Sequence, residues 1–173
     1  MKKILITLAL LSNQVLFSQT YTQEKLNILW QAAGDWKVGS SQQTDKVILE
    51  EYIHTKETLN NWTELGTNIV QKGIKSSTLG LIAQQMYDQA QKNNPKAVFT
   101  PVAEDAKAAI PWVMFKIESL ADGDKKAQSQ LFYVVQGKLN LYITFFATKK
   151  DKLTKEQIDK YGKFFRTCKI QYK

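Results

Sequence analysis

The chain has 173 residues, and its 43% share of hydrophobic residues is typical of a folded domain, so intrinsic disorder is not expected. It carries 24 basic and 16 acidic residues, a formal net charge of +8. One cysteine, Cys168, and one histidine, His54, are present, which excludes an internal disulfide and a structural zinc site of four Cys and His ligands. We therefore expect no metal and no cofactor.

The N-terminus has the three-part pattern of a secretory signal peptide. Two lysines are followed by an uncharged apolar run from Ile4 to Leu11, and Ser18 is a small residue suited to the position before a cut. The run is shorter than the ~20 residues of a membrane-spanning helix, and no cysteine follows it to carry a lipid anchor. We therefore expect residues 1–18 to be a cleaved signal and residues 19–173 to be one domain. This bacterial type of signal predicts an exported protein, periplasmic or secreted, with no transmembrane segment in the mature chain.

The first element expected in the mature chain is a helix over residues 21–34. Its apolar side chains recur at helical spacing, Thr22 is placed to cap it, and Gly34 is a suitable stop. The apolar face consists of Leu26, Leu29, Trp30 and Ala33.

Three strands, a helix and four more strands are expected next. The strands are rich in β-branched and aromatic residues, the helix has an apolar stripe, and Asp122-Gly123 is a turn signal between the fifth and sixth strands. The strands are predicted over 36–42, 46–55, 62–72, 97–104, 111–119, 128–135 and 139–148, and the helix over 76–94. The last strand is apolar on nearly both faces, so we place it at the centre of the sheet.

The C-terminal helix has the clearest signals. Thr154 and Gln157 are spaced as a capping box, and Leu153 and Ile158 as a hydrophobic staple around it. Gly162 in mid-helix indicates a close approach to the sheet. The order α-βββ-α-ββββ-α predicts an α+β fold, an antiparallel sheet of about six or seven strands with helices packed on one face.

No set of catalytic residues is evident in the sequence. His54 shares a strand face with Glu50 and Tyr52, and no Gly-x-Ser-x-Gly elbow accompanies it. Cys168 lies late in the last helix, where the helix dipole disfavours a thiolate, so we expect it to pack as a small apolar residue. The acidic pairs Glu50-Glu51 and Glu104-Asp105 are adjacent strand residues that point to opposite faces. We therefore assign no catalytic, cofactor or metal residue, and an enzyme is the less favoured class.

The positive charge bears on the choice of partner. Without Lys2 and Lys3 the net charge falls to +6, and the lysines are scattered along the chain. Arg166 is the one arginine, whereas nucleic-acid readers depend on arginine for bidentate contacts. We therefore expect no nucleic-acid partner. We expect an unknown protein or small-molecule partner, and an acidic one would suit a moderately basic surface.

The element order from residue 21 to 168 resembles the PsbP-like α/β sandwich superfamily. The segment Glu57 to Glu64 that opens a strand, the meander from Val98 to Ala147 and the closing helix after Leu153 carry this resemblance. That group includes extrinsic photosystem proteins, small bacterial periplasmic proteins and a nuclear-transport regulator. The resemblance implies a non-catalytic binding or assembly protein, with no shared catalytic residues.

Two alternatives remain open at this point. Gly34-Asp35-Trp36 after a short helix resembles the Gly-x-Trp start of lipocalins, which would make the protein a carrier of a small apolar ligand. A hydrolase with a carboxylate or Ser site built from separated loops is the second alternative, because such a site leaves no pattern in one sequence.

Overall fold

The computed structural model describes residues 23–76, 78–121 and 126–172. Its elements are β1 (Glu24–Asn27), a 3₁₀ helix η1 (Trp30–Ala33), β2 (Trp36–Gln43), β3 (Val47–His54), β4 (Glu64–Lys72), α1 (Leu79–Asn93), β5 (Val98–Asp105), β6 (Trp112–Ser119), β7 (Gln128–Gln136), β8 (Asn140–Thr148), α2 (Lys155–Thr167) and β9 (Lys169–Tyr172). The predicted signal over residues 1–18, the Thr22 cap and the Asp122-Gly123 turn lie outside the described residues.

Seven of the strands form one antiparallel sheet in the order β2-β3-β4-β8-β7-β6-β5. The predicted α+β class and the antiparallel sheet of seven strands are confirmed. β8 lies in the middle of the sheet, as its apolar sequence predicted. The sheet is open, with β2 and β5 as its edges.

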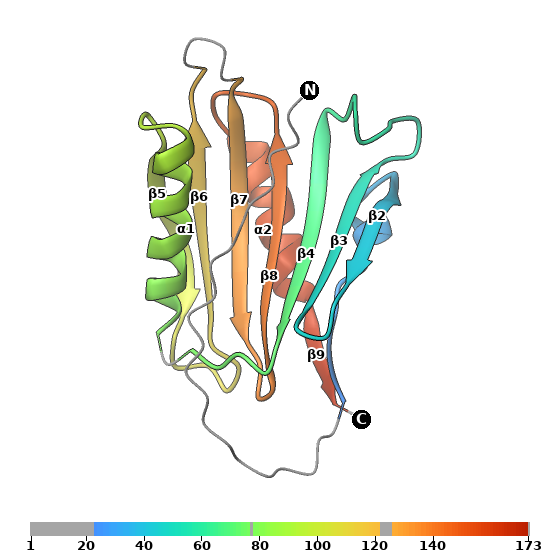
Figure 1. Ribbon diagram of the computed structural model, residues 1–173, viewed down its shortest axis with the longest axis vertical. Helices are drawn as coiled ribbons and strands as arrows, with labels where there is room; N and C mark the ends of the chain where they lie inside the picture. Colours follow the sequence, from blue (N-terminus) through green and yellow to red (C-terminus); the bar gives the residue numbers. More distant parts are fainter. Residues whose placement is uncertain (1–22, 77, 122–125, 173) are drawn as a thin grey trace.

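The two helices lie on opposite faces of this sheet, so the expectation that they share one face was wrong. α1 lies in front of the sheet at its β5–β6 side, where it packs against β6, and α2 lies behind the sheet (Figure 1). The reason is the central strands, whose alternate side chains are apolar on both faces and therefore need cover on both. In β6, Phe115 and Ile117 belong to the core on the α1 side, and Met114 belongs to the core on the α2 side.

Trp30 is the centre of the core on the α2 side. It is fully buried, and its Nε1 donates to Asn68 Oδ1 on β4 at 3.0 Å. Its ring lies directly over Gly66, where any β-carbon would come within 2.7 Å of the indole. The absence of a side chain at position 66 is therefore what lets η1 pack closely against β4.

The prediction of a first helix over residues 21–34 was wrong. Its described part is the short strand β1 followed by η1, and Leu29, placed on the apolar face by the helical spacing, is 58% exposed. β1 pairs antiparallel with β9, a C-terminal strand that the sequence analysis did not predict. Glu24 also accepts hydrogen bonds from the backbone N–H groups of Leu139 and Asn140, each at 3.0 Å. These distant partners, invisible to a local pattern, determine the conformation of the segment.

The predicted features of the last helix are confirmed. Thr154 Oγ1 accepts from the Gln157 backbone N–H at 3.1 Å, and the Gln157 side chain accepts in return from the Thr154 N–H at 3.1 Å. Leu153 is buried in the apolar cluster against which Ile158 packs. Gly162 is buried, and a β-carbon there would lie 3.4 Å from Met114 Sδ on the sheet.

Candidate functional site

A partly buried cluster of polar side chains lies where the end of β3, the start of β4 and the N-terminal turns of α2 meet. His54 is the last residue of β3 and Glu64 the first of β4. Both side chains point to the face that α2 covers, because alternation puts His54 beside Tyr52 and Glu64 in line with Gly66. The capping box of α2 brings Gln157 to the same place.

Glu64 connects these three elements. Its carboxylate accepts from Gln157 Nε2 at 3.0 Å and from Tyr161 Oη at 3.2 Å, and it lies 3.2 Å from His54 Nε2. The side chains of His54 and Glu64 are 29% and 25% exposed, so the pair is partly shielded from water. The carboxylate is therefore already engaged by three side chains before any ligand arrives.

His54 is held from three sides. Its Nδ1 faces the Asp35 carbonyl oxygen at 3.0 Å, its Nε2 faces Glu64, and its ring stacks on Trp36 with centroids 4.5 Å apart. Both ring nitrogens therefore already face a polar partner within the protein. The side chain of Asp35 is held by Thr55, whose hydroxyl donates a hydrogen bond to the Asp35 carboxylate at 2.6 Å.

Tyr161 is a hydrogen-bond donor in this cluster. Burial raises the pKa of its phenol, and the nearby Glu64 carboxylate raises the pKa further. Its ring stacks on Phe146 with centroids 3.9 Å apart. A tyrosine held in this way stays protonated and orients Glu64, and it has no role as a base.

A solvent-open pocket of about 290 Å³ lies beside this cluster, at the N-terminal end of α2. It is lined by Glu64, Lys150, Thr154, Glu156, Gln157, Lys160 and Tyr161. Glu64 is already hydrogen-bonded within the cluster, whereas Lys150 and Lys160 form no ion pair with any carboxylate of the described residues. The pocket lining therefore carries two ammonium groups and two carboxylates, of which Glu64 is already hydrogen-bonded within the cluster.

The other residues that the sequence analysis weighed do not come together with this cluster. Cys168 caps the opposite end of α2, where burial raises the pKa of its thiol to about 12. Glu50 accepts from Tyr52 Oη at 2.9 Å, and Glu51 lies on the other face of β3. Glu104 and Asp105 are exposed on the edge strand β5.

Sequence reasoning weighed His54 without assigning it a role, and it missed the residues around it. Glu64 lies 93 residues from Gln157 and 97 from Tyr161 along the chain, so no spacing pattern joins them. The one usable signal was the capping box, which fixes where Gln157 must lie on α2. Lys150 and Lys160 were counted only as scattered surface charge.

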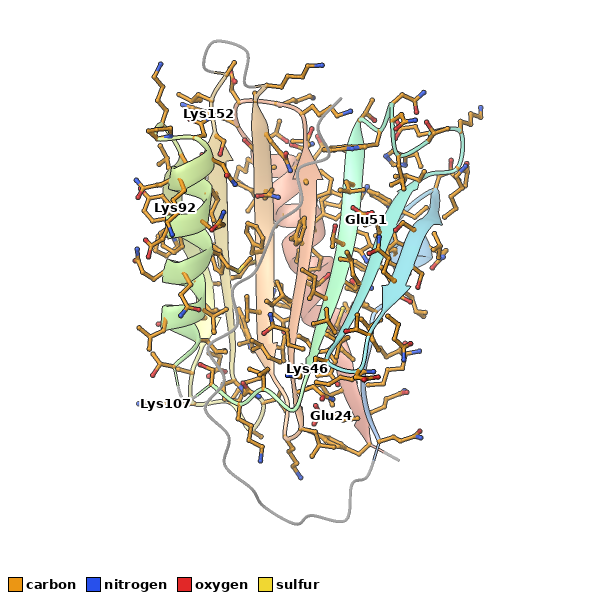
Figure 2. All side chains as sticks on the ribbon, viewed as in Figure 1. Glu24, Lys46, Glu51, Lys92, Lys107 and Lys152 are labelled. Carbon is orange, nitrogen blue, oxygen red and sulfur yellow. The ribbon has the colours of Figure 1, made fainter. Side chains whose placement is uncertain are left out.

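Within the described ranges, no group of three or more His, Cys, Asp or Glu side chains is arranged to hold a metal ion. Of the helices described, neither has the length and apolarity needed to cross a bilayer. Lysines also occur far from the pocket, since Lys46 and Lys107 lie at the end of the molecule opposite Lys152 (Figure 2). The basic charge as a whole is thus spread over the molecule.

The fold and the cluster define a small α+β protein with an open antiparallel sheet, one helix on each face and a polar pocket at one end. No family model matches the chain, and no curated protein is similar enough to count as a relative.

Proposed function

We propose that this protein is an exported, non-catalytic binding or assembly protein that takes an acidic partner at the N-terminal end of α2. The observation that carries the proposal is the open pocket there, in which Lys150 and Lys160 form no ion pair with a carboxylate of the described residues. Exposed ammonium groups without counter-ions attract anionic groups, and the protein's net positive charge adds to that attraction.

The His54 cluster supports binding rather than catalysis. Both ring nitrogens of His54 face acceptors, and the side chains bonded to Glu64 are an imidazole, an amide and a phenol. None of these is a serine or cysteine nucleophile of the kind a hydrolytic site requires. The network instead fixes α2 to the sheet and holds the wall of the pocket in position.

The arrangement of the elements supports the PsbP-like resemblance as part of this proposal. Three strands, α1, four strands and α2 follow one another, and the helices enclose the sheet from both sides as in an α/β sandwich. The lipocalin-like alternative draws no support from the sheet, which is open and has no described pairing between β2 and β5.

Export is proposed on the charged start, the short apolar run and Ser18. Intact-mass measurement of the protein recovered from the periplasm or medium tests it. We expect a mass that begins at Gln19. A recovered protein that still contains residues 1–18 would refute the proposed cleavage.

Binding is tested by capture from a bacterial envelope extract on the immobilised protein at about 0.05 M and about 0.5 M salt, because exposed charges are screened within ~8 Å at physiological ionic strength. The test variant is Lys150→Glu with Lys160→Glu. The control, Lys92→Glu with Lys107→Glu, changes the net charge equally on exposed residues of α1 and the loop after β5. We expect a defined partner that is captured at low salt, lost from the test variant and retained by the control. Equal loss of capture from both variants, or capture that does not change with salt, would contradict the proposal. A catalytic turnover that disappears when His54 is substituted would show that the protein is an enzyme instead.

A further inference from the structure

The face of the sheet on the α1 side is apolar across strands that α1 does not cover. α1 packs against β6 and β7, and no described helix lies in front of β8, β4 and β3 (Figure 1). On these three strands, direct cross-strand partners place two rows of side chains next to each other on the α1 side. The rows are Ile143-Ile69-Leu49 and Phe145-Thr67-Glu51. We call this surface the β8–β4–β3 face.

The side chains in the middle of the β8–β4–β3 face are nevertheless buried. Thr67 and Ile143 are each 2% exposed, and Phe145 is 5% exposed. A side chain on a sheet face that is open to water keeps its outer surface exposed, so values this low require a covering layer. The Thr67 hydroxyl also has no hydrogen-bond partner among the described residues, as is expected where the covering groups lie outside them.

The connections that the structure describes lie at the two ends of this face. The segment from β4 to α1 is hydrogen-bonded through two backbone groups to the side chain of Gln136, the last residue of β7. At the opposite end, Trp62 precedes β4, and its ring lies 4.3 Å from the ammonium group of Lys149, which follows β8. The two rows lie between these ends. Their cover must therefore come from outside residues 23–76, 78–121 and 126–172.

Residues 1–22 are the one stretch outside those ranges that is longer than four residues, and they can reach the face. The described chain begins beside the start of β8, because Glu24 accepts hydrogen bonds from the backbone N–H groups of Leu139 and Asn140. The nine residues of β8 span ~30 Å, whereas 22 extended residues span up to ~70 Å. The composition also fits an apolar face, since residues 4–11 and 15–17 are apolar except for one threonine and carry no charge.

We infer that, in the uncleaved chain, the apolar segment from Ile4 to Phe17 packs on the β8–β4–β3 face. Burial of its apolar side chains against those of the two rows is favourable. A tethered segment has an effective concentration of about a millimolar, so it occupies the face ahead of a second copy of the chain. This inference goes beyond the proposed function and does not depend on the pocket at α2. The proposed cleavage after Ser18 then removes the cover and opens an apolar surface in the exported protein.

Photocross-linking of the full chain tests the inference. The chain is synthesised without membranes, so that the N-terminal segment is retained, and its mass confirms that all 173 residues are present. The photoreactive residue p-benzoylphenylalanine replaces Ile69 on the face. As a control it replaces Leu81, which is 60% exposed on α1. After irradiation the monomer is isolated and digested, and the cross-linked peptides are identified by mass spectrometry.

A matched pair of variants tests whether the contact is apolar. Leu8→Asp with Leu11→Asp places two charges in the apolar run, and Asn13→Asp with Gln14→Asp places the same two charges in the polar break of the segment. We expect position 69 to cross-link to residues 4–17 within the monomer, and position 81 to give at most about a tenth of that yield. The leucine pair should lower the yield from position 69 about tenfold and increase the binding of an apolar fluorescent dye severalfold, because a buried charge is costly. The polar pair should change both by less than about twofold.

Several results would overturn the inference. One is the absence of any cross-link between position 69 and residues 4–17, and another is an equal yield from position 81. Cross-links that form only between two chains would assign the face to a second copy instead. Equal losses of yield in the two aspartate pairs would show that the segment is not held by apolar packing.

Discussion

Trp30 shows how one side chain decides the packing of a whole face. It contacts the rings of Trp36, Tyr52, Phe164 and Phe165 at centroid distances between 5.1 and 5.9 Å, and its N–H is satisfied by Asn68. Thr144 donates to the same Asn68 oxygen at 2.8 Å, which fixes the amide orientation. The close approach of Trp30 to β4 depends on Gly66, so the direction in which one added methyl group there changes the stability can be predicted.

We expect Gly66→Ala to destabilise the protein by ~1–3 kcal/mol or more, because the new β-carbon would come within 2.7 Å of the Trp30 ring and both groups belong to rigid elements. Gly80→Ala in α1 is the matched control. Its β-carbon would meet only Thr78 at 3.9 Å, and alanine is the better helix former, so it should be neutral or stabilising by up to about 1 kcal/mol. Urea denaturation of both variants measures the difference. Equal midpoints would contradict the packing.

The thiol of Cys168 is expected to be unreactive in the folded protein. Burial raises its pKa from an ordinary value near 9 to about 12. At pH 8 the thiolate is then rarer in the folded than in the unfolded chain, and alkylation by iodoacetamide should be on the order of a hundredfold or more slower than in denaturant. The folded state binds the thiol proton more tightly than the unfolded chain does. The free energy of unfolding is therefore unaffected by this group below pH 9 and decreases as the pH rises from about 9 to 12. Equal alkylation rates with and without denaturant would show that the thiol is not buried.

The N-termini of the two helices offer a direct comparison at the scale of the element. Thr154 caps α2 with its side chain, whereas Thr78, the N-cap of α1, makes no side-chain capping hydrogen bond. Thr154→Ala should therefore cost ~1 kcal/mol of unfolding free energy, and Thr78→Ala a few tenths at most. Thermal and denaturant unfolding of the pair measures this. A loss of the same size in both variants would mean that threonine at these positions acts through something other than its cap.

Elements whose stability comes from their own residues were predictable, and those fixed by distant partners were not. The strands over 36–42 and 128–135 and the last helix were predicted within a few residues because periodicity and capping are local. The segment after Thr22 was predicted as a helix because Leu26, Leu29 and Trp30 also fit that spacing. Its true conformation depends on β9, almost 150 residues away, whose four residues carry little signal of their own.

The residues of the candidate site were likewise predictable only where a local sequence pattern marks them. The sequence identified His54 as the one histidine and Gln157 as part of a cap. It could not place Glu64 against Gln157, because Gln157 lies 93 residues further along the chain and meets Glu64 only when α2 packs on the sheet. The contact between Glu64 and His54 follows from the pairing of the consecutive strands β3 and β4. Nor could it show that the Trp36 indole N–H lacks a hydrogen-bond partner among the described residues, since hydrogen-bond satisfaction is a property of the folded interior.

At the scale of the whole molecule, the open sheet has two edge strands, β5 and β2, and the pairing of each with its neighbour is irregular. β5 contains Pro101, which has no backbone N–H, and its pairing with β6 shifts register between Pro101 and Ala103. β2 has a similar shift between Val38 and Ser40. Such irregularities discourage edge-to-edge association with another sheet. They also leave the edges less well anchored than the centre, so stability should vary across the sheet.

Native-state hydrogen exchange should reveal this gradient. Most of β8 is buried and it pairs with a neighbour on both sides, whereas β5 is exposed along most of its length and pairs on one side only. Amides in the centre of β8 can exchange only when the sheet separates, and those of β5 and β2 can exchange by opening one edge. After correction for intrinsic rates, the slowest amides of β8 should be protected roughly a hundredfold more than the slowest of β5. Measurement by NMR or mass spectrometry at residue resolution provides its own control in β4 and β7, which flank β8 and should follow it closely. Protection of β5 equal to that of β8 would mean that the edge is covered in solution, by a second copy or another chain, and would contradict an open sheet.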